Sequence, residues 1–372
     1  MLTSFQLTMP KAAHPFSVKI DPDGEALLRC LRREGTPQRV HAIELLIDEE
    51  IKATIADRYG LLADISPDRE HYLLQREIRL QRFLGYDYVR WGVDDVGIKI
   101  DRLTADDTAP LARTGGRSFV NEHRGPITNW EEFHAYPWPD PRKITVRQLE
   151  WLQANLPDDM CIIGSRGFAH FAEYLTWLMG YETLCFALYD QRDLVAAISQ
   201  RLIDLYQVVV QKMLQFDRVK VIWGSDDMGF RSGTLIGPKD LRQFVLPGHR
   251  AMADASHRAG RLYLLHSCGK LDAIMDDLLD DVGIDGLHSF EDTIKTVHET
   301  KAKYGHRIAV LGGIDVDFLC RSDPSAVRRR TRETLERCQE GGGYCLGTGN
   351  SVANYIPLDN YLAMLDEGRL FS

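Results

Sequence analysis

The sequence predicts an α/β protein that folds as a single-domain (β/α)8 TIM barrel. Short aliphatic runs alternate with amphipathic helical stretches along the chain, and this alternation implies a parallel sheet. Eight such runs are present, the number that closes a parallel sheet into a barrel. A doubly wound open sheet is the competing architecture, but the first-turn glycine fingerprint of dinucleotide-binding sheets is absent.

The expected strands are short and spread over most of the chain. They comprise residues 39–44, 88–93, 160–165, 219–225, 262–267, 286–289, 308–312 and 344–347. Active sites of such barrels form where the strands end at their carboxyl termini, so the residues that end each strand are the candidates for chemistry.

Two helices are clearly indicated between these strands. Residues 190–216 carry leucine, isoleucine and valine at three- and four-residue spacing. A second helix is expected to start at Ser322-Asp323-Pro324 and to stop at the glycines 341–343. Its arginines alternate with acidic residues, which favours an exposed helix face over an anion-binding site.

The 372 residues suit one long barrel domain, which we expect to span residues 31–372. Residues 1–30 are expected to form an irregular N-terminal arm, because Pro10, His14 and Pro15 interrupt its start. Residues 101–143 form a long polar stretch punctuated by Pro and Trp, which predicts an early loop serving as a lid or a dimer contact.

Composition excludes several classes of partner. The net charge of -9 argues against binding to nucleic acid or to anionic membrane surfaces, which require clustered Lys and Arg. No segment reaches the roughly 18 uninterrupted apolar residues of a membrane span, and no signal-peptide core is visible. Seven scattered cysteines indicate free thiols in a reducing cytoplasm, so we expect a cytoplasmic protein.

The richest strand end is Leu264-Leu265-His266-Ser267-Cys268. Residues i and i+2 of an extended chain point the same way, so His266 and Cys268 are able to face one metal ion. Imidazole together with thiolate suits zinc. A third ligand is needed, and Cys345, His288 and Glu291 are the candidates at later strand ends. Cys345 fits equally well as a small buried residue of its strand.

Another strand ends in Trp223-Gly224-Ser225-Asp226-Asp227. Paired carboxylates at a barrel mouth are able to hold a cation, bind a substrate or perform acid–base work. They serve equally well as a helix cap and a salt-bridge partner. Because Asp226 ends the strand, it is the residue that we select for the proton-transfer role.

Several short motifs occur together in one order and spacing. They are Ser225-Asp226-Asp227-Met228-Gly229, Gly237-Pro238, His266-Ser267-Cys268-Gly269, Gly283-Ile284-Asp285-Gly286, Gly312-Gly313-Ile314-Asp315 and Tyr355-Ile356-Pro357. From about residue 161 onward the chain resembles the uroporphyrinogen-decarboxylase-like superfamily. The combination is specific for the superfamily, although each motif alone is not.

The resemblance implies a (β/α)8 barrel with a deep cleft at the carboxyl ends of its strands. The superfamily contains cofactor-free decarboxylases, and also methyltransferases that exchange methyl groups between small substrates, corrinoid proteins and thiols. Several of those methyltransferases hold zinc with a His-x-Cys pair and a later Cys. The resemblance therefore implies zinc at His266 and Cys268, a corrinoid on a separate protein, and a homodimer.

Two departures separate the branches. True decarboxylases resemble one another in an Arg-Gln-Ala-Gly-Arg motif at the first strand, where the arginines bind the carboxylates of the tetrapyrrole. Residues 41–46 instead read His-Ala-Ile-Glu-Leu-Leu, so Glu44 replaces a guanidinium. The late His of the decarboxylases is replaced by Asn350, which also stands near the position of the later Cys of the methyltransferases.

These residues predict a methyltransferase that moves a methyl group between a small methylated compound and a corrinoid protein or a thiol. The expected roles are proton transfer by Asp226 and Glu291, metal binding by His266, Cys268 and Cys345, and substrate binding by Glu44, Trp223, Asp227, His288 and Asn350. A metal-independent decarboxylase or lyase is the alternative. A catalytically silent binding protein on the same barrel is a third hypothesis.

Overall fold

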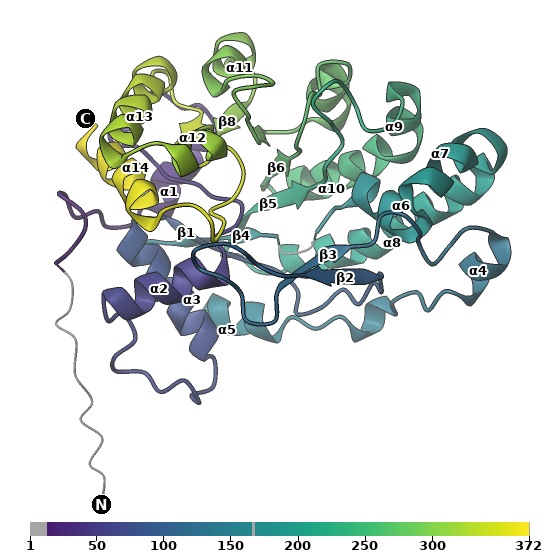
Figure 1. Cartoon of the computed structure of the whole chain (residues 1–372), viewed down its shortest axis with the longest axis horizontal. Coiled ribbons are helices and arrows are strands. Elements are labelled where there is room, and N and C mark those ends of the chain that lie inside the picture. Colours follow the sequence, from purple (N-terminus) through teal and green to yellow (C-terminus); the bar gives the residue numbers. More distant parts are fainter. Residues whose placement is uncertain (1–12, 166–167, 372) are drawn as a thin grey trace, which may run out of the picture.

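The structure is a computed structural model that describes residues 13–165 and 168–371, and it confirms the predicted α/β architecture. Its centre is a curled parallel sheet of seven strands with helices around the outside (Figure 1). In spatial order the strands are β1 (Tyr88–Trp91), β4 (Cys161–Gly164), β5 (Val219–Ser225), β6 (Leu262–His266), β7 (Gly286–His288), β8 (Ala309–Leu311) and β9 (Tyr344–Cys345).

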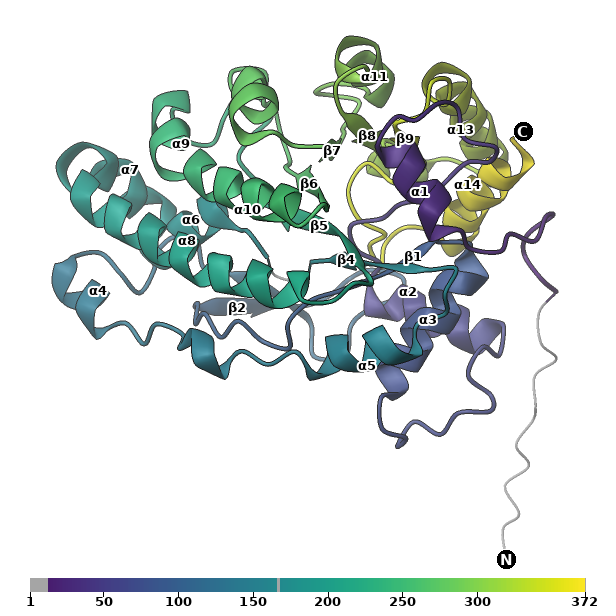
Figure 2. The same ribbon diagram turned by 180° about the vertical axis from the view of Figure 1, so that it is seen from behind.

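Helices precede the sheet and connect its strands. They are α1 (Gly24–Leu31), α2 (Glu49–Arg58), α3 (Tyr72–Leu84), α4 (Trp130–Ala135), η1 (Pro141–Lys143), α5 (Arg147–Asn155), α6 (Phe171–Met179), α7 (Tyr181–Asp190), α8 (Arg192–Leu214), α9 (Pro238–Phe244), α10 (Leu246–Arg258), η2 (Asp277–Val282), α11 (Val297–Tyr304), α12 (Val316–Arg321), α13 (Pro324–Cys338) and α14 (Leu358–Leu370). Figure 2 shows α8 and α10 side by side on the outer face of β5 and β6.

The predicted strand at residues 39–44 does not form as a regular strand. This segment makes one isolated parallel bridge, between Ala42 and Leu346, and its Ile43 amide donates to the Leu346 carbonyl beside β9 at 2.8 Å. On its other side it meets a side chain of β1, because the Glu44 amide donates to the Tyr88 hydroxyl at 2.8 Å. An irregular segment therefore fills the space between the last and first strands of the sheet.

Strand alternation decides which side chains enter the barrel. In β6, Leu262 and Leu264 belong to the apolar core inside the barrel, whereas Tyr263 and Leu265 pack in the core between sheet and helices. His266 is the next residue of the inward row. The end of β6 therefore delivers this imidazole to the inside of the barrel mouth.

The long early segment contains more structure than the expected loop. Strands β2 (Arg102–Ala105) and β3 (Arg117–Val120) form an antiparallel hairpin, and the helix α4 follows. The Arg113 guanidinium lies 2.6 Å from a carboxylate oxygen of Asp48, which ties the connection between β2 and β3 to the barrel. This tie holds the segment next to the loops that end the strands.

The N-terminal stretch contains one helix, and the two helices expected from the sequence are present. Residues 1–12 of the expected arm lie outside the described residues, and α1 lies within the remainder, with Leu27, Leu28 and Leu31 buried. The expected helices are confirmed as α8 and α13, and Asp323 caps α13. Within the described ranges, no helix combines the length and apolar character needed to cross a membrane.

Candidate metal centre

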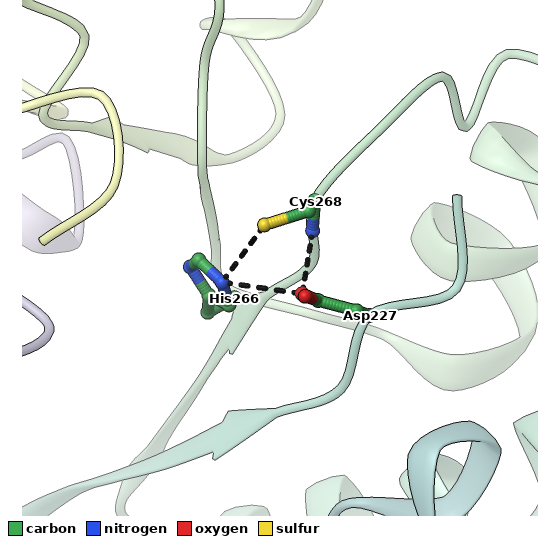
Figure 3. A group of neighbouring side chains, drawn as sticks. All are labelled: Asp227, His266 and Cys268. Atoms are coloured by element: carbon green, nitrogen blue, oxygen red, sulfur yellow. Dashed lines mark hydrogen bonds and ion pairs between the residues drawn. The ribbon is translucent and has the colours of Figure 1, made fainter. Parts of the chain in front are cut away.

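Three potential metal ligands converge where β5 and β6 end. Cys268 Sγ and one carboxylate oxygen of Asp227 each lie 3.4 Å from His266 Nε2 (Figure 3). The three ligand atoms all lie within 4.8 Å of one another. His266 ends β6, Cys268 follows it by two residues, and Asp227 follows β5. Neighbouring parallel strands thus bring one nitrogen, one sulfur and one oxygen together.

The donor set and its spacing fit zinc. Zinc bonds of about 2.0–2.3 Å at tetrahedral angles place neighbouring ligand atoms roughly 3.3–3.6 Å apart. The two distances of 3.4 Å from His266 Nε2 agree with that geometry. Three protein ligands leave a fourth position for water or substrate, as in catalytic zinc sites.

The electrostatics of the ligands are strongly perturbed. Burial raises the pKa of the Cys268 thiol, and the neighbouring Asp227 carboxylate raises it further. Burial also acts to raise the pKa of Asp227, but its contact with His266 outweighs burial and holds that pKa well below the usual range. Because a coordinating metal deprotonates a thiol outright, the protonated Cys268 requires a cation before it becomes a thiolate.

His288 at the end of β7 orients the imidazole of His266. Nδ1 of His266 lies 2.7 Å from Nδ1 of His288, whose Nε2 lies 3.3 Å from the Thr348 carbonyl. Burial lowers the pKa of His288 well below its ordinary value, so this ring is neutral. A neutral His288 donates from Nε2 to Thr348 and accepts at Nδ1 from His266, which leaves Nε2 of His266 free for a metal.

Glu44 lies behind this histidine pair. Its carboxylate accepts hydrogen bonds from the amide of Thr348 at 2.8 Å and from the Thr348 hydroxyl at 2.7 Å. Burial raises the pKa of Glu44 to about 8. The residue that replaces the decarboxylase arginine therefore holds the loop whose carbonyl contacts His288. Glu44 also lines a small cavity of about 150 Å³ together with Tyr88 and Arg90.

Asn350 contacts the sulfur of Cys268. Its Nδ2 lies 3.2 Å from Cys268 Sγ, and the Ser289 hydroxyl lies 3.7 Å from the same sulfur. The predicted substrate residue Asn350 therefore joins the cluster at the position expected, by resemblance, for a later Cys ligand. Two hydrogen-bond donors aimed at one sulfur suit a thiolate better than a thiol.

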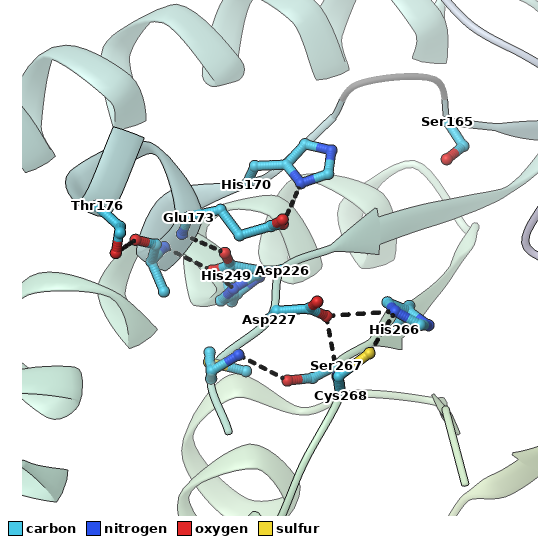
Figure 4. Close-up of polar contacts among 12 residues, drawn as sticks. Ser165, His170, Glu173, Thr176, Asp226, Asp227, His249, His266, Ser267 and Cys268 are labelled. Atoms are coloured by element: carbon cyan, nitrogen blue, oxygen red, sulfur yellow. Dashed lines mark hydrogen bonds and ion pairs between the residues drawn. The ribbon is translucent and has the colours of Figure 1, made fainter. Parts of the chain in front are cut away.

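Asp226 does not face the cluster. Its two carboxylate oxygens accept hydrogen bonds from the amides of Ala172 and Glu173 at 2.8 and 3.0 Å, and one lies 2.9 Å from His249 Nε2 (Figure 4). The side chain is fully buried. It belongs to the outward row of β5, and so it caps the first turn of α6 rather than entering the barrel.

Cys345 is not part of the cluster either. Its side chain is fully buried on β9 and hydrogen-bonds to Cys30 of α1. Hydrogen-bond register staggers around a barrel, so residues near the ends of different strands do not reach the same height. Among the described residues, Asp227 and not Cys345 is the third potential ligand.

The remaining predicted residues lie around the cluster at different depths. Trp223 is buried inside the barrel, with its ring edge against His288 at 5.6 Å between centroids. Glu291 is exposed on the loop after β7 and lines two cavities near the mouth. Trp223 supports the histidine pair, whereas Glu291 faces solvent.

The pair of His170 and Glu173 lies near the site and was not predicted from the sequence. Nδ1 of His170 pairs with the carboxylate of Glu173 at the start of α6, and both side chains are largely buried (Figure 4). Burial raises the pKa of Glu173, whereas the contact with Glu173 overcomes burial and raises the pKa of His170. The spacing of three residues at a helix start was the available signal.

Cavities open beside the cluster. Asp227 lines a cavity of about 650 Å³ together with Glu173 and Trp177. Asn350 and Glu291 line another, of about 630 Å³. Asp227 of the cluster, and Asn350 beside Cys268, therefore face space that a small molecule is able to occupy.

A family model matches most of this barrel. The model described as uroporphyrinogen decarboxylase (URO-D) covers residues 120–370, which include β4 through α14 and all three potential ligands. The match begins at the last residue of the hairpin strand β3.

Curated relatives match a shorter part of the chain. The methylcobamide:CoM methyltransferase MtaA of Methanosarcina barkeri is 30% identical over 135 residues, which cover 36% of this chain and 37% of that protein. A methylated-thiol–coenzyme M methyltransferase of Methanosarcina mazei is 31% identical over 133 residues, which cover 36% of this chain and 33% of that protein. The matches thus span about a third of the length of these relatives.

A solved structure resembles the whole fold. A methyltransferase from Methanosarcina mazei superimposes with a TM-score of 0.67 at 17% sequence identity, and the match covers 94% of this chain and 99% of that one. At this identity the likeness establishes the barrel-like fold alone.

Proposed function

Because the chain belongs to the uroporphyrinogen decarboxylase (URO-D) family, we propose that it is the methyltransferase type of member, not the decarboxylase type. It moves a methyl group between a small methylated compound and a corrinoid protein or a thiol. The names of the curated relatives support this class of reaction. A corrinoid partner carried on a separate protein and a homodimeric assembly belong to the same proposal.

The observation that carries the proposal is the cluster of Asp227, His266 and Cys268. Its nitrogen, sulfur and oxygen atoms lie within 4.8 Å of one another at the barrel mouth. A cofactor-free decarboxylase has no need of this donor set. Glu44 also stands where arginines are expected by resemblance, so the guanidinium groups that would bind a substrate with many carboxylates are missing from residues 41–46.

These three residues would hold a zinc ion, which would supply the Lewis acidity that lowers the pKa of a substrate thiol. His288 keeps His266 in the tautomer that binds the metal, and Asn350 and Ser289 donate to the sulfur of Cys268. These contacts hold the ligands in place before substrate arrives.

Methyl transfer to a thiol needs no external oxidant or reductant. An electron pair of the substrate sulfur forms the bond to the methyl carbon, and the bond from that carbon to its donor breaks with its electrons left on the donor. The thiol proton passes to the Glu173 carboxylate or to water. Glu173 takes the proton-transfer role predicted for Asp226, because Glu173 lines the cavity beside Asp227.

Metal content tests the proposal directly. Purified protein is expected to hold about one zinc per chain, measured by elemental analysis. Cys268→Ala should lose that zinc, and Asp227→Asn should weaken its retention by about 10–100-fold, since each removes a ligand or its charge. Cys345→Ser is the matched control, because this thiol lies apart from the cluster and its loss should leave zinc unchanged.

Two results would contradict the proposal. Wild-type protein that neither contains nor binds zinc would make the metal-independent lyase the leading function. If Cys345→Ser loses zinc and Cys268→Ala keeps it, Cys345 is the cysteine ligand and Cys268 is not. A methyl-transfer assay with the zinc-loaded protein and a methylated corrinoid protein then measures the activity itself.

A further inference from the structure

The cavity of about 650 Å³ beside the cluster has a distinctive lining. Carboxylates of Glu122, Glu173 and Asp227 lie on it together with the aromatic rings of Trp177, Tyr181 and Phe230. Glu122 follows the hairpin strand β3, Trp177 lies on α6, Tyr181 begins α7 and Phe230 follows β5. Four separate segments of the barrel mouth therefore build one wall.

Charge on this wall disfavours anions. Glu173 pairs with His170, and Asp227 lies in the candidate metal cluster, whereas Glu122 is exposed at the rim next to His123. Among the described residues that line this cavity, three are acidic, one is a histidine (His123), and none is Lys or Arg. A second cavity, lined by Asn350, adds Glu291, Asp292, Asp315 and Asp317, of which Asp292 is paired to Arg330 and Asp317 to Arg321.

Aromatic rings next to a carboxylate suit a cation. Phe230 and Tyr181 expose 65% and 39% of their surface, so their rings are available to a ligand. The Tyr181 hydroxyl is fixed by donation to the Leu235 carbonyl at 2.8 Å. Trp177 packs against Tyr174 at 4.9 Å between ring centroids, which holds its ring in place. Ammonium groups bind aromatic faces through cation–π attraction, and fixed rings lose little entropy on binding.

We propose that the small substrate is a thiol, or its methyl thioether, that carries a cationic ammonium group. Its sulfur binds at the open position beside Asp227, His266 and Cys268, and its ammonium group lies in the cavity against Trp177 and Glu122. The inference rests on the proposed methyltransferase function, because it places the sulfur at that metal centre. What the inference adds to that function is the positive charge of the substrate.

Binding of three thiols that differ only in their end group tests this inference. Thiocholine, 2-mercaptoethanol and 2-mercaptoethanesulfonate place a cation, a neutral hydroxyl and an anion two carbons from the sulfur. Isothermal titration of the zinc-loaded protein should give the tightest binding for thiocholine, and binding at least about tenfold weaker for the sulfonate. Glu122→Gln and Trp177→Leu should weaken thiocholine about fivefold and leave 2-mercaptoethanol unchanged.

Matched controls lie outside the cavity on the exposed helix α4. Glu131→Gln and Trp130→Leu change the same residue types and should leave all three affinities unaltered. Equal binding of the three thiols, or tightest binding of the sulfonate, would overturn the proposal of a cationic substrate. The proposal of a metal centre would be unaffected. Absence of binding for every thiol in zinc-loaded protein would overturn both proposals together.

Discussion

Asp226 and Asp227 are neighbours in sequence with opposite positions in the structure. The inward row of β5 contains Val221 and Trp223, and the side chain after Ser225 therefore turns outward. Asp226 is buried among the amides of α6, whereas Asp227 lies at the barrel mouth beside His266. One step along a strand separates a structural carboxylate from a potential metal ligand.

The raised pKa of Glu44 gives a prediction at the scale of a residue. Its pKa of about 8 in the folded protein lies above the ordinary value of about 4.3 for a glutamate. Between these two values the folded state holds a proton that the unfolded state has released. The free energy of unfolding contributed by Glu44 is therefore fully present below the ordinary pKa, and it is lost as pH rises towards 8.

Glu44→Gln should remove this pH-dependent part of the free energy of unfolding while keeping hydrogen bonds to Thr348. Urea unfolding at about pH 5 and pH 8 should show a smaller loss of stability with pH in the variant, by on the order of 1–3 kcal/mol. Glu291→Gln, at an exposed glutamate, serves as the control and should track the wild type. Identical pH dependence in Glu44→Gln and wild type would contradict the buried, protonated carboxyl.

At the scale of elements, Asp226 joins α6, α10 and the end of β5. It accepts two amide hydrogen bonds from the first turn of α6, and it contacts His249 of α10. His249 in turn lies 2.9 Å from the hydroxyl of Tyr263 on β6. The carboxylate thereby fixes the helix that carries Glu173 and Trp177 towards the cavity.

Asp226→Asn should therefore destabilise the protein more than it alters the metal centre. We expect a loss of about 2–4 kcal/mol in the free energy of unfolding, measured in urea, because an amide replaces a buried charged acceptor. Zinc content should stay at the wild-type level. Asp317→Asn, at an exposed ion pair, should change stability by less than about 1 kcal/mol. Loss of zinc with unchanged stability would instead assign Asp226 to the metal centre.

At the scale of the whole molecule, the barrel is closed by an irregular segment next to β1. Asp87 is fully buried and accepts a hydrogen bond from the Asp23 amide at 2.7 Å. It also pairs with Arg39 and lies 2.7 Å from Nδ1 of His41. One carboxylate thus joins β1, the start of α1 and residues 39–41 of the closing segment.

Asp87→Asn should loosen this closure. Removing the charge of a buried network is expected to cost about 3–5 kcal/mol in unfolding free energy, and amides of residues 41–47 should exchange hydrogen faster than those of β5. Asp359→Asn alters an exposed pair with Arg58 and should leave both measurements nearly unchanged. Uniform exchange over the whole barrel would show that the closing segment is not a separate unit.

The sequence by itself determined the parallel α/β barrel, the order of its regular strands and the pair of His266 and Cys268. These follow from local rules, since hydrophobic periodicity sets strands and helices, and spacing of two residues sets a common face. The capped start of α13 was equally readable.

Only the tertiary structure decided the third potential ligand, the closing segment and the cavity wall. Asp227 meets His266 because β5 and β6 are neighbours in register, with Ser225 opposite His266. Cys345 turns to Cys30 because the heights of strand ends depend on the stagger of the whole barrel. Glu122, Trp177 and Phe230 come from separate segments that no local pattern joins. Contacts between distant residues are set by packing of the complete barrel, which a single sequence does not display.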